Sequence, residues 1–232
     1  MTHADAPRVT RRDLLRSAAA TAAILSIGAC SGGSRPSLGS RPATTTTLLP
    51  PLTTARRPPS VALIGDSISS LSESALKTAL GEAGFDHIEF DAKPGRRIAV
   101  GDSPGLAVLD FAIGAGLEPD VWIIQLGSND IEHYDGVEAY AALIDLVVER
   151  LPPPTPLVWV DTYSSWFLPE AEAFNATLRE AMARRGDTAV ADWYARCVEV
   201  GPSTLVPDGL HPVESGFAIF AEVTVAPIAL LT

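Results

Sequence analysis

The stretch SVALIGDS, residues 60–67, decides the fold class, because a short apolar run with β-branched residues ends abruptly in a polar turn. Continuous apolar runs of this length are typical of a parallel strand that is buried on both faces. Similar runs recur along the chain, and stretches with helical spacing lie between them. The predicted strands are 61–64, 87–90, 121–126, 157–160 and 189–192, and the predicted helices are 72–83, 106–114, 137–150, 170–185 and 213–226. This alternation predicts an α/β fold with a parallel sheet covered by helices on both faces.

The segment before this domain has the composition of an export signal. Residues 10–16 (TRRDLLR) resemble a twin-arginine signal, and Ile27-Gly-Ala-Cys30 resembles a lipobox, in which the cysteine is acylated. The uncharged apolar run from Ala18 to Ala29 is shorter than the roughly 20 residues that a membrane helix needs. We therefore expect a signal peptide over residues 1–30 and a lipid anchor at Cys30, with a secretory signal cut elsewhere or a buried helix as the alternatives.

Residues 31–59 are rich in Ser, Thr, Gly and Pro and are too polar to bury a core. They predict a disordered linker that holds a domain of residues 60–232 up to ~90 Å from the anchor, or about 30 Å as a flexible coil. An exported lipoprotein on the outer face of a bacterial cell membrane is the expected location, and a secreted protein is the alternative.

The charge of the chain argues against nucleic acid as a partner. Of 17 Lys and Arg residues, eight precede residue 60, whereas only two of 28 acidic residues do, so the domain has a net charge of about −17. Such a surface repels polyanions and tolerates neutral or cationic substrates.

Polar residues follow the predicted strands at positions where ligands gather in open α/β sheets. These segments are Gly65-Asp-Ser67, Lys93-Pro-Gly-Arg96 and Gly127-Ser-Asn-Asp130, and a late loop adds Asp208-Gly-Leu-His211. Together they supply a hydroxyl, a glycine backbone, a primary amide and a carboxylate next to an imidazole. This combination predicts an acyl-transfer site.

The chemistry assigns a role to each group. The Ser67 hydroxyl needs a base, which the His211 imidazole supplies, and the Asp208 carboxylate can hold the second ring nitrogen. A tetrahedral intermediate needs hydrogen-bond donors, and the backbone N–H groups of Ser67 and Gly95 with the amide of Asn129 provide three.

These four segments, in this order, resemble the sequence blocks of the SGNH (GDSL-like) hydrolase family over residues 61–216. The resemblance implies a three-layer α/β/α sandwich with a parallel, flavodoxin-like sheet. It also implies a catalytic triad of Ser67, Asp208 and His211 and an oxyanion hole of Ser67, Gly95 and Asn129. Ile68 departs mildly from the family pattern, and Gly101 lies close enough to leave the choice of Gly95 open.

The other polar and aromatic candidates have weaker signals. Asp66 and Asp130 are interpreted as turn and cap residues, and His87 and His133 as non-catalytic. The segment 161–167 supplies aromatic residues that wall a pocket or pack on the next helix, whereas Trp122, Trp159 and Trp193 are expected in strands and in the core. No His or Cys cluster has the spacing of a metal site.

The resulting hypothesis is a serine esterase, without a cofactor or metal, that acts on small-molecule or glycan esters. Its substrates would be carboxylic esters, with short acyl or O-acetyl groups, of envelope glycans or lipids. The alternatives are an O-acyltransferase that acts on a glycan and a catalytically silent glycan-binding lipoprotein.

Overall fold

The computed structural model describes residues 59–134, 136–151 and 153–231. The expected signal peptide, the lipobox at Cys30 and the linker up to residue 58 lie outside these residues. The described part is built on one five-stranded sheet. Its strands are β1 (Ser60–Gly65), β2 (His87–Ala92), β3 (Val121–Gln125), β4 (Leu157–Val160) and β5 (Thr188–Ala191).

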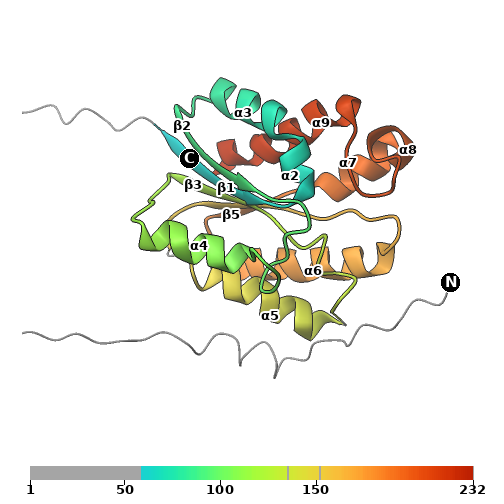
Figure 1. Cartoon of the computed structure of the whole chain (residues 1–232), viewed down its shortest axis with the longest axis horizontal. Helices are drawn as coiled ribbons and strands as arrows, with labels where there is room; N and C mark the ends of the chain where they lie inside the picture. Colours follow the sequence, from blue (N-terminus) through green and yellow to red (C-terminus); the bar gives the residue numbers. More distant parts are fainter. Residues whose placement is uncertain (1–58, 135, 152, 232) are drawn as a thin grey trace, which may run out of the picture.

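All strand pairs are parallel, and the strand order is β2-β1-β3-β4-β5. This is the flavodoxin-like order, in which the chain reverses its direction of winding between β1 and β3. The expected fold class is thereby confirmed. Figure 1 shows the sheet edge-on between two layers of helices.

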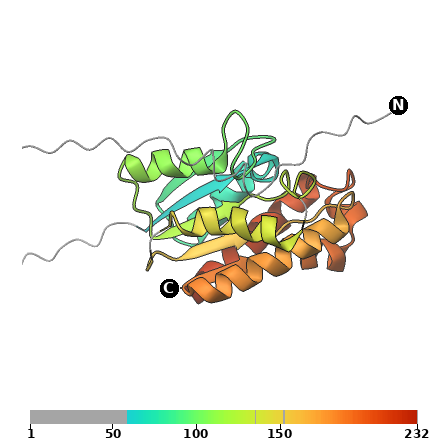
Figure 2. The ribbon, with the colours of Figure 1, turned by 90° about the horizontal axis from the view of Figure 1, so that it is seen from below.

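One layer contains α3 and the helices of the C-terminal part, and the other contains α4, α5 and α6 (Figure 1). Figure 2 is seen from the side of α4, α5 and α6, which lie across the strands in green, yellow and orange. The helices are α2 (Ser67–Leu71), α3 (Glu73–Glu82), α4 (Gly105–Gly114), α5 (Val137–Val148), α6 (Leu168–Arg185), α7 (Trp193–Val200), α8 (Pro202–Leu205) and α9 (Glu214–Val225), and the 3-10 helix η1 (Ala226–Leu230) follows.

The alternation of side chains along each strand divides the core into two clusters. In β1, Val61 and Leu63 pack with the α3 and α9 layer, whereas Ala62 and Ile64 pack with the α4 to α6 layer. β3 and β4 divide in the same way. A strand that is apolar at every position therefore fills two cores, one on each face of the sheet.

The predicted elements differ from the observed ones mainly at their ends. The predicted strand 157–160 and the predicted start of a helix at residue 137 are confirmed. β2 extends to Ala92 instead of ending at residue 90, and β5 ends at Ala191, one residue earlier than predicted. Trp193 was predicted in a strand, and this is wrong: it is the first residue of α7, capped by the Asp192 carboxylate, which accepts from Ala195 N. Its ring is nevertheless fully buried and packs edge-on against Phe220 at 5.0 Å.

The short elements α2, α7, α8 and η1 were not predicted as separate helices. Each is too short to show a helical repeat of apolar residues, so the hydrophobic pattern carries little signal for it. Within the residues that the structure describes, none of the helices combines the length and the apolar character needed to cross a bilayer.

Candidate active site

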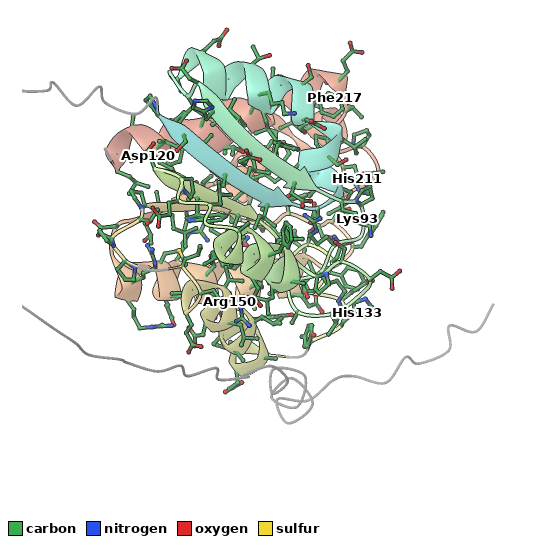
Figure 3. All side chains as sticks on the ribbon, turned by 60° about the vertical axis from the view of Figure 1, so that its left-hand side comes forward. Lys93, Asp120, His133, Arg150, His211 and Phe217 are labelled. Atoms are coloured by element: carbon green, nitrogen blue, oxygen red, sulfur yellow. The ribbon has the colours of Figure 1, made fainter. Side chains whose placement is uncertain are left out.

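Residues that are far apart in the sequence meet at the carboxyl ends of β1 and β3, where the strand order reverses. A pocket of about 310 Å³ opens there. Figure 3 shows His211 and Lys93 beside the arrowheads at this end of the sheet. The pocket is lined by Ser67, Pro94, Gly95, Ser128, Asn129, Glu132, Ser164, Trp166, Phe167, Leu210 and His211.

A continuous chain of hydrogen bonds joins the serine, the histidine and the aspartate that the sequence singled out. The Ser67 hydroxyl lies 2.9 Å from Nε2 of His211, although 144 residues separate them. Nδ1 of His211 lies 2.8 Å from Oδ2 of Asp208. These are hydrogen-bond distances, so a proton can pass from the hydroxyl to the imidazole without any movement of the backbone.

The turn at residues 206–211 fixes the aspartate beneath the imidazole ring. Oδ1 of Asp208 accepts from the backbone N–H groups of Leu210, at 2.9 Å, and His211, at 2.7 Å, and Oδ2 faces the ring. Partial burial alone would raise the pKa of Asp208. The backbone hydrogen bonds and the contact with His211 together lower it by more, so the net pKa lies below its ordinary value. The ionised carboxylate can only accept, so Nδ1 carries the proton and Nε2 is left to accept from Ser67.

The turn that carries Ser67 is held by buried polar groups. Asp66 caps the N-terminus of α2, because its carboxylate accepts from Ile68 N at 2.9 Å. Gln125, the last residue of β3, accepts from the backbone N–H groups of Asp66 and Ser69 and from the Ser69 hydroxyl. The position of Ser67 is therefore set by contacts on both sides of it.

The same Asp66 carboxylate reaches the turn that follows β3. It accepts from the Ser128 hydroxyl and, at 3.2 Å, from Nδ2 of Asn129. Burial is the main cause that raises the pKa of Asp66. Three donors in this network compensate for the loss of water around the carboxyl group. Asp66 is thus a turn and cap residue, as its place in the sequence indicated, and it also links two of the segments that line the pocket.

The loop after β2 brings Gly95 to the pocket. Gly95 has φ +71°, a conformation that favours glycine, and it lines the pocket together with Ser67 and Asn129. The neighbouring Arg96 is buried and donates to the backbone carbonyls of Gly65 and Asp91 and to the Asp91 carboxylate. Gly101, the other glycine considered for this position, does not line the pocket.

The amide of Asn129 is oriented by its neighbours. Its nitrogen donates to Asp66 Oδ2 at 3.2 Å and to the carbonyl of Arg96 at 3.3 Å, which ties the turns after β1, β2 and β3 together. Both distances are at the long end of the range for N–H···O bonds. The three expected oxyanion donors, from Ser67, Gly95 and Asn129, therefore belong to residues that line one pocket.

Asp130 is fully buried behind the pocket and supports the loop after β2. Both of its carboxylate oxygens accept from Ile98 N, and the Arg97 guanidinium lies 3.6 Å away. Burial is the main cause that raises the pKa of Asp130 to about 7. Instead of an ordinary helix cap, Asp130 is a buried carboxyl group that ties β3 to a loop more than 30 residues earlier in the chain.

Several residues around the site were not given a role from the sequence. Gln125 carried the clearest signal, because a polar residue ends an otherwise apolar buried strand. Glu132 and Ser164 also line the pocket. Trp166 and Phe167 were expected either to wall a pocket or to pack on the next helix; both line the pocket, and Phe167 also packs against the core cluster that contains residues of α6. His87 begins β2, and His133 lies in the turn after β3 with its Nε2 3.1 Å from Glu132. Neither histidine lines the pocket.

Among the described residues, no group of three or more His, Cys, Asp and Glu side chains is placed to hold a metal ion. Cys197 is a buried free cysteine. Burial is the main cause that raises its pKa, so it remains a neutral thiol.

The blocks that line the pocket also match a known family. A model of the GDSL-like lipase/acylhydrolase family matches residues 63–219. The chain belongs to this family. No curated protein matches the chain in sequence. Members of the GDSL-like family are hydrolases and esterases, in agreement with the resemblance found in the sequence.

Solved structures share the fold at low sequence identity. The C-terminal catalytic domain of peptidoglycan O-acetyltransferase A (OatA) from Streptococcus pneumoniae is 20% identical, with a TM-score of 0.62, and the match covers 75% of this chain and 94% of that one. TesA is 20% identical, with a TM-score of 0.58 and coverage of 75% and 99%. The family 3 carbohydrate esterase of Clostridium thermocellum is 19% identical, with a TM-score of 0.54 and coverage of 74% and 96%.

The buried carboxyl group of Asp130 leads to a prediction about pH. Its pKa of about 7 lies above the ordinary 3.8, so the folded chain binds a proton that the unfolded chain has released between about pH 4 and pH 7. Its contribution to stability is therefore present at low pH and is lost as pH rises through this window. Asp130→Asn cannot ionise, so the free energy of unfolding of the variant should rise relative to that of the native chain between about pH 5 and pH 8.

Urea unfolding of both chains at the two pH values measures this difference. The carboxyl group of Asp161, whose pKa burial also raises to about 7, is present in both chains and cancels in the comparison. A difference that is flat or that falls with pH would contradict the assignment.

Proposed function

We propose that the chain is a serine ester hydrolase in which Ser67, His211 and Asp208 form the catalytic triad. The observation that carries the proposal is the 2.9 Å contact between the Ser67 hydroxyl and His211 Nε2. The other ring nitrogen, Nδ1, lies 2.8 Å from Asp208. A serine hydroxyl next to a carboxylate-bound imidazole is the arrangement that makes a weak nucleophile reactive.

The first half-reaction forms an acyl-enzyme. Nε2 of His211 takes the hydroxyl proton as Oγ of Ser67 forms a bond to the ester carbonyl carbon, and the carbonyl oxygen becomes an oxyanion. The backbone N–H groups of Ser67 and Gly95 donate to this oxygen, and the Asn129 amide adds a third donor when one of its N–H groups turns from Asp66 Oδ2 or the Arg96 carbonyl to the oxyanion. When the intermediate collapses, the bond to the leaving oxygen breaks, and that oxygen takes the proton from His211.

The second half-reaction releases the acid. A water molecule gives a proton to Nε2 of His211 and attacks the acyl carbon, and the bond to Ser67 Oγ then breaks as the proton returns to Oγ. Asp208 stabilises the imidazolium in both steps without taking its proton. No cofactor is needed for this sequence of steps.

Ser67→Ala should lower the hydrolysis of p-nitrophenyl acetate by at least about 10³-fold, because the variant has no nucleophile. A fluorophosphonate probe should label the native chain and leave the variant unlabelled, while circular dichroism of the two remains the same. Undiminished turnover by the variant would rule out the mechanism. A folded native chain that the probe does not label would instead support the catalytically silent, glycan-binding alternative.

The substrates that fit best are carboxylic esters with short acyl groups, O-acetyl esters in particular, on envelope glycans or lipids. The pocket of about 310 Å³ is at the lower end of the range for ligand sites, which favours a short acyl group. Apolar surface predominates in its lining, but Ser128, Asn129 and Glu132 add polar groups that suit an alcohol with further hydroxyl groups.

An O-acyltransferase that acts on a glycan is the second candidate, and the similarity to the catalytic domain of peptidoglycan O-acetyltransferase A is the observation that favours it. In this reaction a sugar hydroxyl replaces water in the second half-reaction. With p-nitrophenyl acetate as donor and a chito-oligosaccharide as acceptor, a hydrolase should release one acetate per donor whatever the acceptor concentration. Formation of acetylated oligosaccharide at the expense of acetate would favour the transferase.

We propose that the domain is exported and held at the outer face of the bacterial cell membrane through a lipid on Cys30, with simple secretion as the alternative. The lipobox-like sequence Ile27-Gly-Ala-Cys30 and the polar stretch that follows it support this placement. Cells that express the chain and are fed radiolabelled palmitate should incorporate label into the native protein and none into Cys30→Ser. Equal labelling of the two would contradict the lipid anchor.

A further inference from the structure

Trp166 is a large aromatic residue that lines the pocket and yet has 61% of its surface exposed. It lies in the segment that follows β4, one residue after Ser165. A tryptophan that leaves this much apolar surface in water gives up much of the burial energy that the side chain could provide. Its position at the rim of the pocket suggests that a ligand covers it.

The ring is supported from beneath by the turn that carries Asp208 and His211. The backbone N–H of Ser165 donates to the carbonyl of Gly209 at 2.8 Å. A Cβ on Gly209 would collide with the Ser165 hydroxyl and would lie 3.0 Å from Nε1 of Trp166, so the indole edge packs directly on the glycine backbone. Because Gly209 lies against this edge, the exposed surface of Trp166 belongs to the remainder of the residue.

The pocket that Trp166 lines also contains polar side chains. Asn129, Ser128 and Glu132 line the same pocket, and the Glu132 side chain is 44% exposed. Glu132 and Trp166 thus give one pocket a carboxylate and an aromatic side chain, which match the two surfaces of a pyranose ring. The sugar hydroxyl groups donate to carboxylate oxygens, and the C–H bonds of the ring pack on the negative face of an aromatic side chain.

We infer that Trp166 is the platform on which the sugar ring of an O-acylated glycan stacks while its acyl group occupies the space beside Ser67. The inference rests on the proposed esterase function and selects glycan esters over lipid esters as its substrates. A lipid ester would place a flexible chain on Trp166 and would leave Glu132 without a hydroxyl partner.

The test compares two acetate esters that differ only in the alcohol: acetylated xylobiose, which has sugar rings, and triacetin, which has none. The native chain should prefer the sugar ester in kcat/KM. Trp166→Leu, which keeps an apolar side chain without an aromatic face, should lower the ratio of the two kcat/KM values about tenfold, mainly through KM for the sugar ester. Trp166→Tyr should restore most of the ratio, because tyrosine again offers an aromatic face.

Phe111→Leu is the matched control, since Phe111 on α4 is 78% exposed and does not line the catalytic pocket. It should leave the ratio unchanged. An equal loss for both esters in Trp166→Leu would show that Trp166 only supports the Asp208–His211 turn, and an unchanged ratio would show that it does not touch the sugar. Either result overturns the inference. The proposed esterase function fails separately, if Ser67→Ala still hydrolyses triacetin.

Discussion

One buried side-chain oxygen ties the turn that carries Ser67 to the sheet. Oε1 of Gln125 accepts from three donors of the turn after β1, and Gln125 is paired with Gly65 in the register of β1 and β3. The approach is so close that a Cβ on Gly65 would lie 2.5 Å from Cβ of Ser69 and 3.3 Å from Gln125 Oε1. The absence of a side chain at residue 65 therefore lets α2 begin directly above the end of the central strands, with Ser67 as its first residue.

The strands and the long helices could be predicted from the sequence, because apolar residues that serve two cores leave an unbroken run in each strand. The segments at the strand ends could be predicted as well, since serine, glycine, asparagine, aspartate and histidine have few other reasons to follow buried strands in this order. The contacts that hold these segments together could not be predicted from the sequence. The link from Asp130 to Ile98 and the link from Asp66 to Ser128 join residues that are 32 and 62 positions apart. A single sequence contains no periodicity that points to such pairs.

The site also contains two buried carboxyl groups, those of Asp66 and Asp130, whose burial is energetically costly. Burial is the main cause that raises the pKa values of Asp66 and Asp130, and both side chains are fully buried between the turns that line the pocket. Asp66 accepts from Ile68 N in its own turn and from the Ser128 hydroxyl after β3, and Asp130 accepts from Ile98 N in the loop after β2. An apolar side chain at either position would leave these buried donors without partners. Leaving them unpaired costs more than burying the carboxyl group that accepts from them. The polar interior behind Ser67 thus connects loops that share no strand or helix.

The direction of β1 fixes how the domain can be presented to its surroundings. Residues that precede Ser60 join the sheet at the amino end of β1, whereas Ser67 follows its carboxyl end, about 20 Å further along the strand. The two termini of this one strand therefore lie at opposite poles of the domain. The chain therefore enters the domain at the end of the sheet opposite the pocket, so a polymer that reaches Ser67 approaches from the side where the N-terminal segment does not join the domain.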